Sequence, residues 1–269
     1  MTIKEAFISH DSHETIWMLE KVTGLSTTQL RLADENSMLS PESEKFFLHM
    51  IEQRNNGMPL QYILGEWEFM GLPMRCCPGV LIPRGDTEVL ASEAIGFLQS
   101  LPGSLTALDM CTGSGCIGIS MAHFCPELRV TATDIDYAPL ALAQENAELN
   151  GVSDRLAFVQ SDLFEHISGQ YHCITANPPY IATEEIETLS KEVKHEPVLA
   201  LDGGLDGLDF YRAIIPASKD FLLSDGGLFL EIGDTQGEAV AEMMRCHGFK
   251  NVVIVNDIEN RHRVVRGMM

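Results

Sequence analysis

The chain has 269 residues, of which 45% are hydrophobic and 21% are charged, as in folded globular proteins rather than disordered ones. Acidic residues outnumber basic ones by 39 to 18, and the net charge of −21 argues against a nucleic-acid partner, since phosphate binding needs a basic face. We find neither a run of ~18 apolar residues nor a signal-peptide pattern. The seven cysteines are an odd number without metal-ligand spacing, so we expect reduced thiols, no metal site and a cytoplasmic location.

Residues 1 to about 55 are expected to form helices, because apolar side chains recur there at helical spacing. The two apolar stripes are Ile16, Trp17, Leu19 and Val22, and then Phe46, Phe47, Met50 and Ile51. Ser40 is a candidate N-cap, with Pro41 in the first turn of the helix that follows. This part of the chain therefore indicates a small helical domain.

A short hairpin is predicted from residues 62–64 and 67–70, punctuated by Gly65 and Gly71. The hairpin would join the helical domain to the rest of the chain. We therefore expect a helical, substrate-recognising domain over 1–58, a hairpin linker over 59–84 and an α/β domain over 85–269.

Predicted strands and helices alternate from about residue 85 onward. The strands are expected at 105–110, 129–134, 156–160, 172–176, 227–232, 252–255 and 263–265. The helices are expected at 86–98, from 116, and at 139–149, 210–223 and 237–246. Such alternation predicts a doubly wound α/β sheet, which binds ligands at the carboxyl ends of its strands, where the strand order switches.

Polar motifs at three successive strand ends indicate an adenosine cofactor. After strand 105–110 comes a loop whose glycines let the backbone approach a ligand, and its residues are Cys111, Thr112, Gly113, Ser114 and Gly115. Asp134 ends the next strand, where a carboxylate can accept hydrogen bonds from both ribose hydroxyls. Beyond the third strand, Asp162 can accept from an adenine amino group, while Leu163 and Phe164 can wall the ring. The glycine spacing leaves a dinucleotide and S-adenosylmethionine both open at this point.

A fourth motif, Asn177-Pro178-Pro179-Tyr180, directly follows strand 172–176. The prolines fix the backbone and remove N–H donors, so carbonyl groups remain to accept hydrogen bonds. The Asn177 amide oxygen and the Pro178 carbonyl can hold both hydrogens of a planar NH₂ group, and Tyr180 can stack on its plane. Orienting such a nitrogen toward a methyl sulfonium favours methyl transfer without a metal or a covalent nucleophile.

Together these motifs resemble a class I S-adenosylmethionine-dependent methyltransferase that acts on a planar nitrogen. More narrowly, the chain resembles the release factor glutamine methyltransferases of the PrmC/HemK family. The segments that carry this narrower resemblance are 59–65, 79–84 with Thr87 and Glu88, Glu196-Pro197 with 200–204, and 261–267. The resemblance implies a Rossmann-like, seven-stranded methyltransferase sheet over residues 85–269.

The resemblance also implies an activity, which is methylation of the glutamine side-chain amide in the Gly-Gly-Gln loop of bacterial class 1 release factors. By resemblance, residues 111–115, Asp134, Asp162 and Leu163 hold S-adenosylmethionine, and residues 177–180 hold the substrate glutamine. Asn177 would also lie close to the cofactor. Pro83 and Arg84 would lie beside the same pocket, although an ion pair between Arg84 and Glu88 is an equally good interpretation.

Three positions depart from the family pattern. Cys111 stands where the first glycine of the loop is usual, and Leu163 stands where some relatives have an aromatic residue. Gly85-Asp86 replaces the usual Pro-Glu pair. The Asn-Pro-Pro-Tyr motif is unaffected, but close backbone approach at Cys111 is in question.

Three rival functions remain open. A sister enzyme that methylates a glutamine of a ribosomal protein would share every core motif. An adenine-N6 DNA or RNA methyltransferase would use the same Asn-Pro-Pro-Tyr logic, but it would need a basic groove that this acidic chain does not suggest. A binding module without activity would be expected to carry a damaged motif. The acidic charge itself suits a basic, RNA-binding protein partner such as a release factor.

Overall fold

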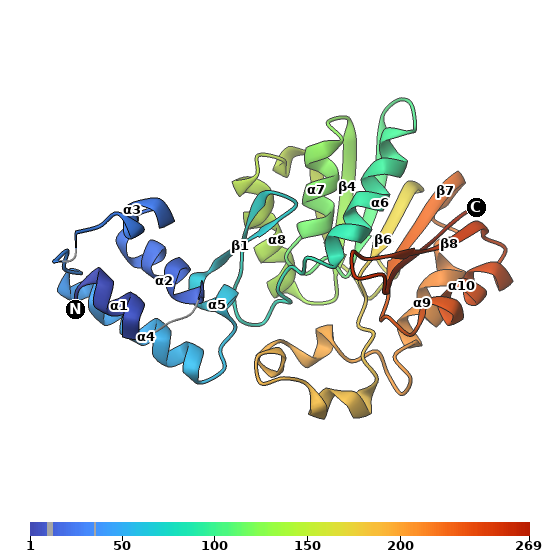
Figure 1. Ribbon diagram of the computed structural model, residues 1–269. Coiled ribbons are helices and arrows are strands. Elements are labelled where there is room, and N and C mark those ends of the chain that lie inside the picture. Colours follow the sequence, from blue (N-terminus) through green and yellow to red (C-terminus); the bar gives the residue numbers. More distant parts are fainter. Residues whose placement is uncertain (10–12, 35) are drawn as a thin grey trace. The chain divides into compact units, whose positions relative to one another are not determined.

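The computed structural model describes residues 1–9, 13–34 and 36–269 (Figure 1). The chain divides into two compact units, one formed by residues 1–66 with 190–195 and the other by residues 67–189 with 196–269. The break between them lies inside the predicted linker. The three-part division into 1–58, 59–84 and 85–269 stays a prediction.

The first unit is helical, as expected. Its helices are α1 (Ile3–Ser9), α2 (His13–Thr23), α3 (Thr27–Arg31), α4 (Pro41–Asn55) and α5 (Leu60–Leu64). The Ser40 hydroxyl accepts from the Ser43 amide at 3.0 Å, which confirms the predicted cap of α4. Helix α2 packs on α4 through buried side chains that include Leu19 and Phe47, whereas Trp17 and Phe46 are 42% and 46% exposed. The predicted helices are therefore confirmed, and within them Trp17 and Phe46 lie nearer the surface than Met18 and Phe47.

Residues 190–195 belong to this unit because Arg54 holds them. Its Nη2 atom lies 2.7 Å from Oε1 of Glu192, and its Nε atom donates to Oε2 of Glu14 at 2.6 Å. These two carboxylates raise the pKa of Arg54. A loop that follows the Asn-Pro-Pro-Tyr motif in sequence is thus anchored on the helical unit.

The hairpin prediction is only half right. Residues 62–64 form part of α5 rather than a strand, and Gly65 ends that helix at φ +72°. The hairpin consists of β1 (Glu66–Phe69) and β2 (Leu72–Arg75). The two residues between these strands both have positive φ, as two-residue hairpin turns require.

The second unit contains the expected seven-stranded sheet, in the order β5-β4-β3-β6-β7-β9-β8. The strands are β3 (Leu105–Met110), β4 (Leu128–Asp134), β5 (Leu156–Gln160), β6 (Tyr171–Ala176), β7 (Leu222–Glu231), β8 (Lys250–Asn256) and β9 (His262–Met268). Neighbouring strands from β5 to β7 run parallel, and β9 is antiparallel to both β7 and β8. This confirms the doubly wound, Rossmann-like fold.

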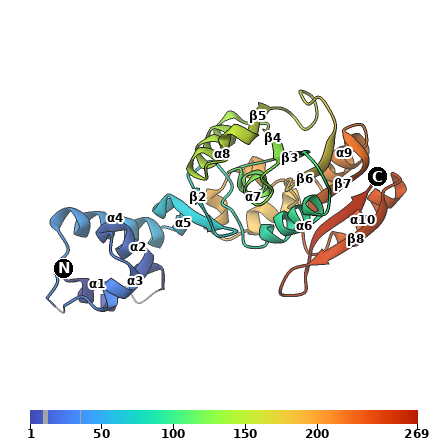
Figure 2. The same ribbon diagram turned by 90° about the horizontal axis from the view of Figure 1, so that it is seen from above.

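Helices cover both faces of the sheet (Figures 1 and 2). They are α6 (Thr87–Gln99), α7 (Cys116–Phe124), α8 (Tyr137–Leu149), α9 (Asp209–Ser218) and α10 (Gly237–Cys246). Helix α9 ends before the predicted residue 223 because β7 begins at Leu222. Short 3₁₀ helices lie at Ser153–Arg155, Thr183–Thr188, Val193–His195 and Val198–Ala200.

Alternate residues of each strand feed two separate cores. Ala107 and Cys173 pack in the core under α6 and α7, while Leu108 and Ile174 pack in the core under α9 and α10. Parallel strands buried on both faces are apolar almost throughout. Polar side chains are therefore concentrated at the strand ends, and Asp109, Thr175 and Glu231 are buried polar residues near the carboxyl ends of the strands themselves.

The strand order reverses direction between β3 and β6. Met110 and Ala176 are paired across these strands, so Cys111 and Asn177 directly follow the ends of two neighbouring strands. Loops at such a switch point diverge to opposite faces of the sheet and leave a crevice between them. The predicted cofactor loop and the Asn-Pro-Pro-Tyr motif therefore begin side by side.

Gly115 tests the packing of the loop after β3. It caps α7 at φ +83°, and a Cβ atom there would lie 2.8 Å from the Ala143 Cβ atom. We expect Gly115→Ala to lower the free energy of unfolding by roughly 2–4 kcal/mol in a urea titration, from backbone strain and overpacking. The control is Gly96→Ala on α6, which meets no atom within 4 Å and is expected to stabilise the fold slightly. Equal midpoints for Gly115→Ala and the wild type would contradict the contact.

Candidate functional site

A cavity opens at the carboxyl ends of the strands in the second unit. The predicted site residues that line it are Pro83, Arg84, Cys111, Thr112, Gly113, Ser114, Asp134, Asp162, Leu163, Asn177 and Pro179. Gly115, Pro178 and Tyr180 are not among the lining residues. The ends of β3, β4 and β5, which the sequence predicts to surround one cofactor, thus meet at one cavity.

The loop after β3 is held by the Asp109 carboxylate beneath it. Its Oδ2 accepts from the Thr112 hydroxyl (2.6 Å) and from the Gly118 amide (3.0 Å), and its Oδ1 accepts from the Thr175 hydroxyl (2.9 Å). Asp109 is fully buried, and this desolvation raises its pKa to about 6 against the opposing effect of those three donors. One side chain on β3 thus forms hydrogen bonds with the loop, with α7 and with β6.

The chemistry of the loop disfavours a pyrophosphate. Oδ2 of Asp134 accepts from the Gly113 amide at 3.0 Å, and the Gly118 amide is bonded to Asp109. An anion at this loop would lie near the carboxylates of Asp109 and Asp134 rather than near unoccupied amides at those positions. Burial also raises the pKa of Asp134. A cationic or uncharged ligand therefore fits the acidic side chains of this loop better than a phosphate would.

The loop after β5 presents Asp162 and Leu163 to the cavity, but Phe164 turns away. The Phe164 ring stacks on Phe221 with centroids 4.6 Å apart, in the core under α9 and α10. Leu163 adopts φ +45°, and its carbonyl accepts from the Ser161 hydroxyl at 2.9 Å. The expectation that Phe164 walls the cavity was wrong, because the tight turn at Leu163 sends the next side chain into the core.

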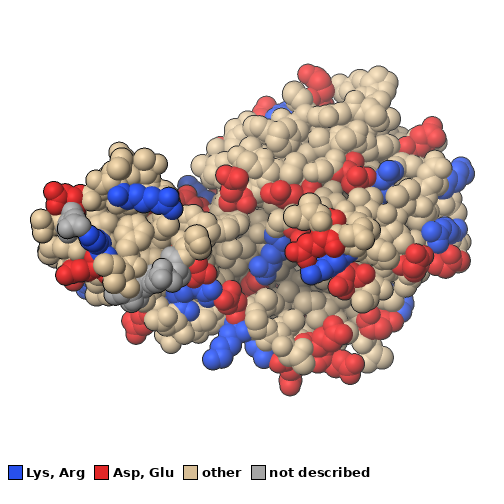
Figure 3. Space-filling view, viewed as in Figure 1, with Lys and Arg blue, Asp and Glu red and all other residues tan. Residues whose placement is uncertain are grey.

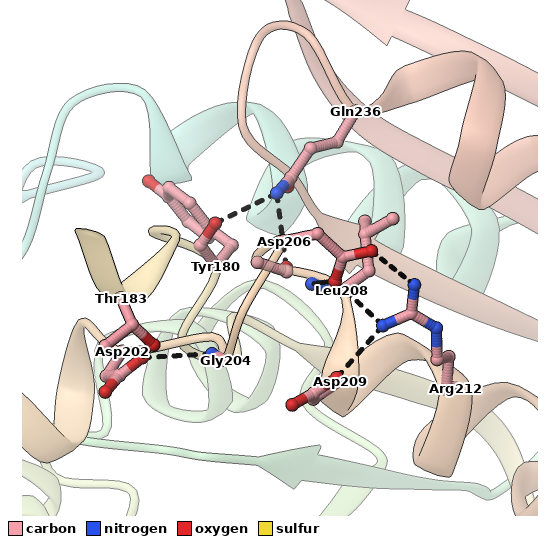
Figure 4. A network of polar contacts seen from close by, with 10 residues as sticks. Tyr180, Thr183, Asp202, Gly204, Asp206, Leu208, Asp209, Arg212 and Gln236 are labelled. Atoms are coloured by element: carbon pink, nitrogen blue, oxygen red, sulfur yellow. Dashed lines mark hydrogen bonds and ion pairs between the residues drawn. The ribbon is translucent and has the colours of Figure 1, made fainter. Parts of the chain in front are cut away.

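The Tyr180 main chain is clamped by a polar network (Figure 4). The Gln236 amide donates to the carbonyls of Tyr180 (2.9 Å) and Gly207 (3.2 Å). A Cβ atom on Gly207 would lie 2.3 Å from the Tyr180 carbonyl oxygen, and one on Gly203 would lie 2.8 Å from the Tyr180 Cα atom. Glycines at 203 and 207 therefore let a second loop close directly over the motif.

The remainder of the network stiffens that second loop. Asp202 accepts from the Thr183 hydroxyl (2.7 Å) and the Gly204 amide (3.0 Å). Arg212 bonds Asp206 and Asp209, with Nη1 2.8 Å from Oδ1 of Asp206 (Figure 4). These contacts fix the loop that covers Tyr180.

One wall of the cavity is closed by an ion pair between Arg84 and Glu196. The Glu196 side chain is 1% exposed and also accepts from the Ile82 amide at 3.1 Å. Burial raises the pKa of Glu196, and Arg84 opposes this shift. The alternative pairing of Arg84 with Glu88 is wrong, since Glu88 instead accepts from the Met70 amide at 2.8 Å.

Sequence reasoning missed several residues that shape this site. Glu196, Gln236 and Thr87 join segments far apart in the chain, and spacing gives no signal for such pairs. Glu196 and Thr87 lie in segments that carry the family resemblance, and this resemblance could have marked them as candidate site residues. Gln236 lay in no motif.

Comparison with known proteins places the chain in a family. Residues 2–65 match the PrmC N-terminal domain, and residues 91–204 match the Methyltransferase small domain. The release factor glutamine methyltransferase of Moorella thermoacetica is 43% identical over 235 residues, which cover 87% of this chain and 82% of that protein. This chain belongs to the release factor glutamine methyltransferase family. The family member of Geobacter sulfurreducens is 40% identical over 94% of this chain and 88% of its own.

A solved structure supports the fold. The ribosomal protein L11 methylase of Lactobacillus delbrueckii subsp. bulgaricus superposes with a TM-score of 0.52 at 24% identity, over 72% of this chain and 83% of its own. At that identity the similarity concerns the fold alone.

The surface carries more acidic than basic side chains, as the net charge of −21 requires. Acidic side chains are spread over the face seen in Figure 3 with basic ones between them, and that view shows no continuous basic surface. The seven cysteines are free thiols. Within residues 1–9, 13–34 and 36–269, no helix is long and apolar enough to cross a membrane. The same residues include no cluster of three metal-ligating side chains.

Cys111 carries strain that its position in the loop explains. Its φ of +54° lies in the left-handed region, where glycine is favoured, and glycine is the usual residue of the family pattern at this point. We expect Cys111→Gly to change the free energy of unfolding by less than ~1 kcal/mol, because relief of strain offsets the greater flexibility of glycine. Cys111→Val should lower it by roughly 2 kcal/mol or more, since β-branched residues rarely adopt positive φ.

The measurement is a urea titration of both variants beside Cys246→Val. Cys246 is an exposed thiol on α10, so its loss controls for removal of a cysteine elsewhere. Equal stabilities of the Gly and Val variants at position 111 would contradict the strained backbone.

Proposed function

We propose that this protein transfers the methyl group of S-adenosylmethionine to the side-chain amide nitrogen of the glutamine in the Gly-Gly-Gln motif of a class 1 release factor. The observation that carries the proposal is the pairing of Met110 with Ala176, which starts the cofactor loop and the Asn-Pro-Pro-Tyr motif side by side. Membership of the family supports the choice of substrate.

The cavity residues fit the proposed cofactor. Asp134 and Asp162 offer carboxylate oxygens for ribose hydroxyls and an adenine amino group, and Leu163 offers an apolar wall for the ring. Cys111, Thr112, Gly113 and Ser114 would line the methionine part of the cofactor, with Gly115 turning the chain into α7. The buried acidic groups near this loop favour a sulfonium cation over a phosphate.

The substrate half would be formed by residues 177–180. Asn177 lines the cavity and its Nδ2 donates to the Thr87 hydroxyl at 3.3 Å, which leaves its amide oxygen to accept from the substrate. The Pro178 carbonyl would accept the second hydrogen, and Pro179 keeps the turn rigid. Tyr180 would stack on the amide plane. Pro83 and Arg84 would line the approach.

The bound cofactor would supply an electrophilic methyl group on sulfur. The chain's own residues would orient the amide nitrogen so that its electron pair forms the new N–C bond as the C–S bond breaks and its electrons pass to sulfur. Acceptors at Asn177 and Pro178 become more favourable as positive charge develops on that nitrogen. The nitrogen then loses one proton to water. Orientation and electrostatics thus carry the step.

The partner and location follow from the same proposal. A net charge of −21 complements a basic, RNA-binding protein and would accelerate its association. Release factors act where translation occurs, so we place the enzyme in the cytoplasm. No direct contact with nucleic acid is proposed.

Asp134 tests the cofactor half by itself. We expect Asp134→Ala to weaken S-adenosylmethionine binding by about 10- to 100-fold in isothermal titration calorimetry, because two charge-assisted hydrogen bonds are lost. The control is Asp154→Ala, an exposed acidic residue in the 3₁₀ helix Ser153–Arg155, which should bind the cofactor like the wild type. Unchanged affinity in Asp134→Ala would remove Asp134 from the cofactor site.

Methyl transfer tests the complete proposal. Purified protein and labelled S-adenosylmethionine are incubated in parallel with a class 1 release factor, total ribosomal protein and adenine-rich DNA. We expect label on the Gly-Gly-Gln peptide of the release factor, at a rate that Asn177→Ala lowers at least ~100-fold through lost orientation. Asn256→Ala on the edge strand β8 is the matched control and should retain the wild-type rate.

Each arm of that assay excludes a different alternative. Label on ribosomal protein alone would assign the sister activity. Label on DNA alone would contradict the inference from charge. Label in none of the arms would overturn the proposed function.

A further inference from the structure

A buried carboxylate, Glu231, lies behind the proposed substrate site. It is the last residue of β7, and its neighbour Leu230 pairs with Ala176 at the end of β6, directly before Asn177. Glu231 is 1% exposed. Burial of a carboxylate is unfavourable unless partners compensate it, so its presence among apolar strand ends requires an explanation.

The contacts of Glu231 lead to the motif. The Tyr180 hydroxyl donates to its Oε1 at 3.4 Å. The Thr87 hydroxyl lies beside the same carboxylate and also receives the 3.3 Å hydrogen bond from Asn177 Nδ2. Oε2 of Glu231 has no hydrogen-bond partner in the part of the chain that the structure describes. The two side chains proposed to hold the substrate amide are therefore connected to one carboxylate.

We propose that Glu231 is a positioning residue, which fixes the Tyr180 ring through its hydroxyl and the Asn177 amide through Thr87. The inference rests on the proposed function, in which these two side chains hold a planar NH₂ group. Without the carboxylate, the Tyr180 ring loses a partner at its far end, and Thr87 is free to reorient. Gln236 and the glycines of residues 203–207 fix only the Tyr180 main chain, so they do not replace this contact.

The electrostatic setting agrees with a partly neutralised carboxylate. Desolvation raises the pKa of Glu231 to about 7, while Arg263 on β9 opposes the shift. Arg263 itself bonds Asp86 at 3.0 Å and Asp257 at 3.2 Å, so its charge is shared. The titratable and charged groups facing Glu231 are Tyr180, Arg263, Asp86, Tyr211 and Cys116.

A double-mutant cycle between Glu231 and Tyr180 tests the proposal. We expect Glu231→Ala and Tyr180→Phe each to lower kcat for methyl transfer by about 10- to 100-fold, with KM for S-adenosylmethionine changed less than about 3-fold. The double variant should be within about 3-fold of Glu231→Ala, because Tyr180→Phe removes only a contact that the loss of Glu231 has already removed. Glu231→Gln keeps an oxygen acceptor and should recover most of the rate.

Ile214→Val, in the core under α9, is the control for a general loss of stability. Its unfolding midpoint should fall while its kcat stays at the wild-type value. Losses that multiply in the double variant, or a wild-type kcat in Glu231→Ala, would overturn the inference while the proposed function stands. If the wild type labels a different substrate, the same cycle is measured on that substrate, and only the proposed function fails.

A second readout does not need turnover. In protein labelled with ¹³C-tyrosine, the Tyr180 Cζ signal, assigned by its loss in Tyr180→Phe, should shift as Glu231 titrates near pH 7. The signal should not shift over this range in Glu231→Gln. A signal that titrates equally in both proteins would overturn the contact, whatever substrate the enzyme uses.

Discussion

The Asp109 carboxylate is the interaction on which the site depends. It accepts hydrogen bonds from the loop, from the start of α7 and from β6, so two adjacent strands and the loop above them share one acceptor. Because Asp109 is buried, these bonds compete with no solvent and hold the loop in a single conformation. The hydrogen bonds of Asp109 therefore fix the loop that forms one side of the crevice between β3 and β6.

Acidic groups also set what the crevice can bind. Asp109 and Asp134 take the amides that a nucleotide-binding loop would offer to phosphate, and burial raises the pKa of both. The basic side chain at the cavity, Arg84, is already paired with Glu196. In the proposed function, these contacts make a glycine-rich loop a better neighbour for a cation than for an anion. The same backbone motif serves different ligands according to the side chains that occupy its amides.

Strand ends and the motifs on them could be read from the sequence because their signals are local. Apolar runs gave the strands of the sheet, and the residues just beyond them, from Cys111 to Asn177, line one cavity. Contacts that depend on packing could not be read. Arg84 and Glu196 are separated by 112 positions, and no spacing rule connects them. The prediction for Phe164 failed for a related reason, since its ring packs on Phe221, which is far away in the sequence.

The anchoring of residues 190–195 on the helical unit has a consequence for dissection of the protein. The chain leaves the sheet unit after the motif, meets Arg54 through Glu192, and returns at Glu196 to pair with Arg84. A cut after residue 66 would therefore free the N-terminal helices but also leave a loop of the remaining fragment without its anchor. Each unit is built from two separate stretches of sequence, so neither can be expressed as a single uninterrupted segment.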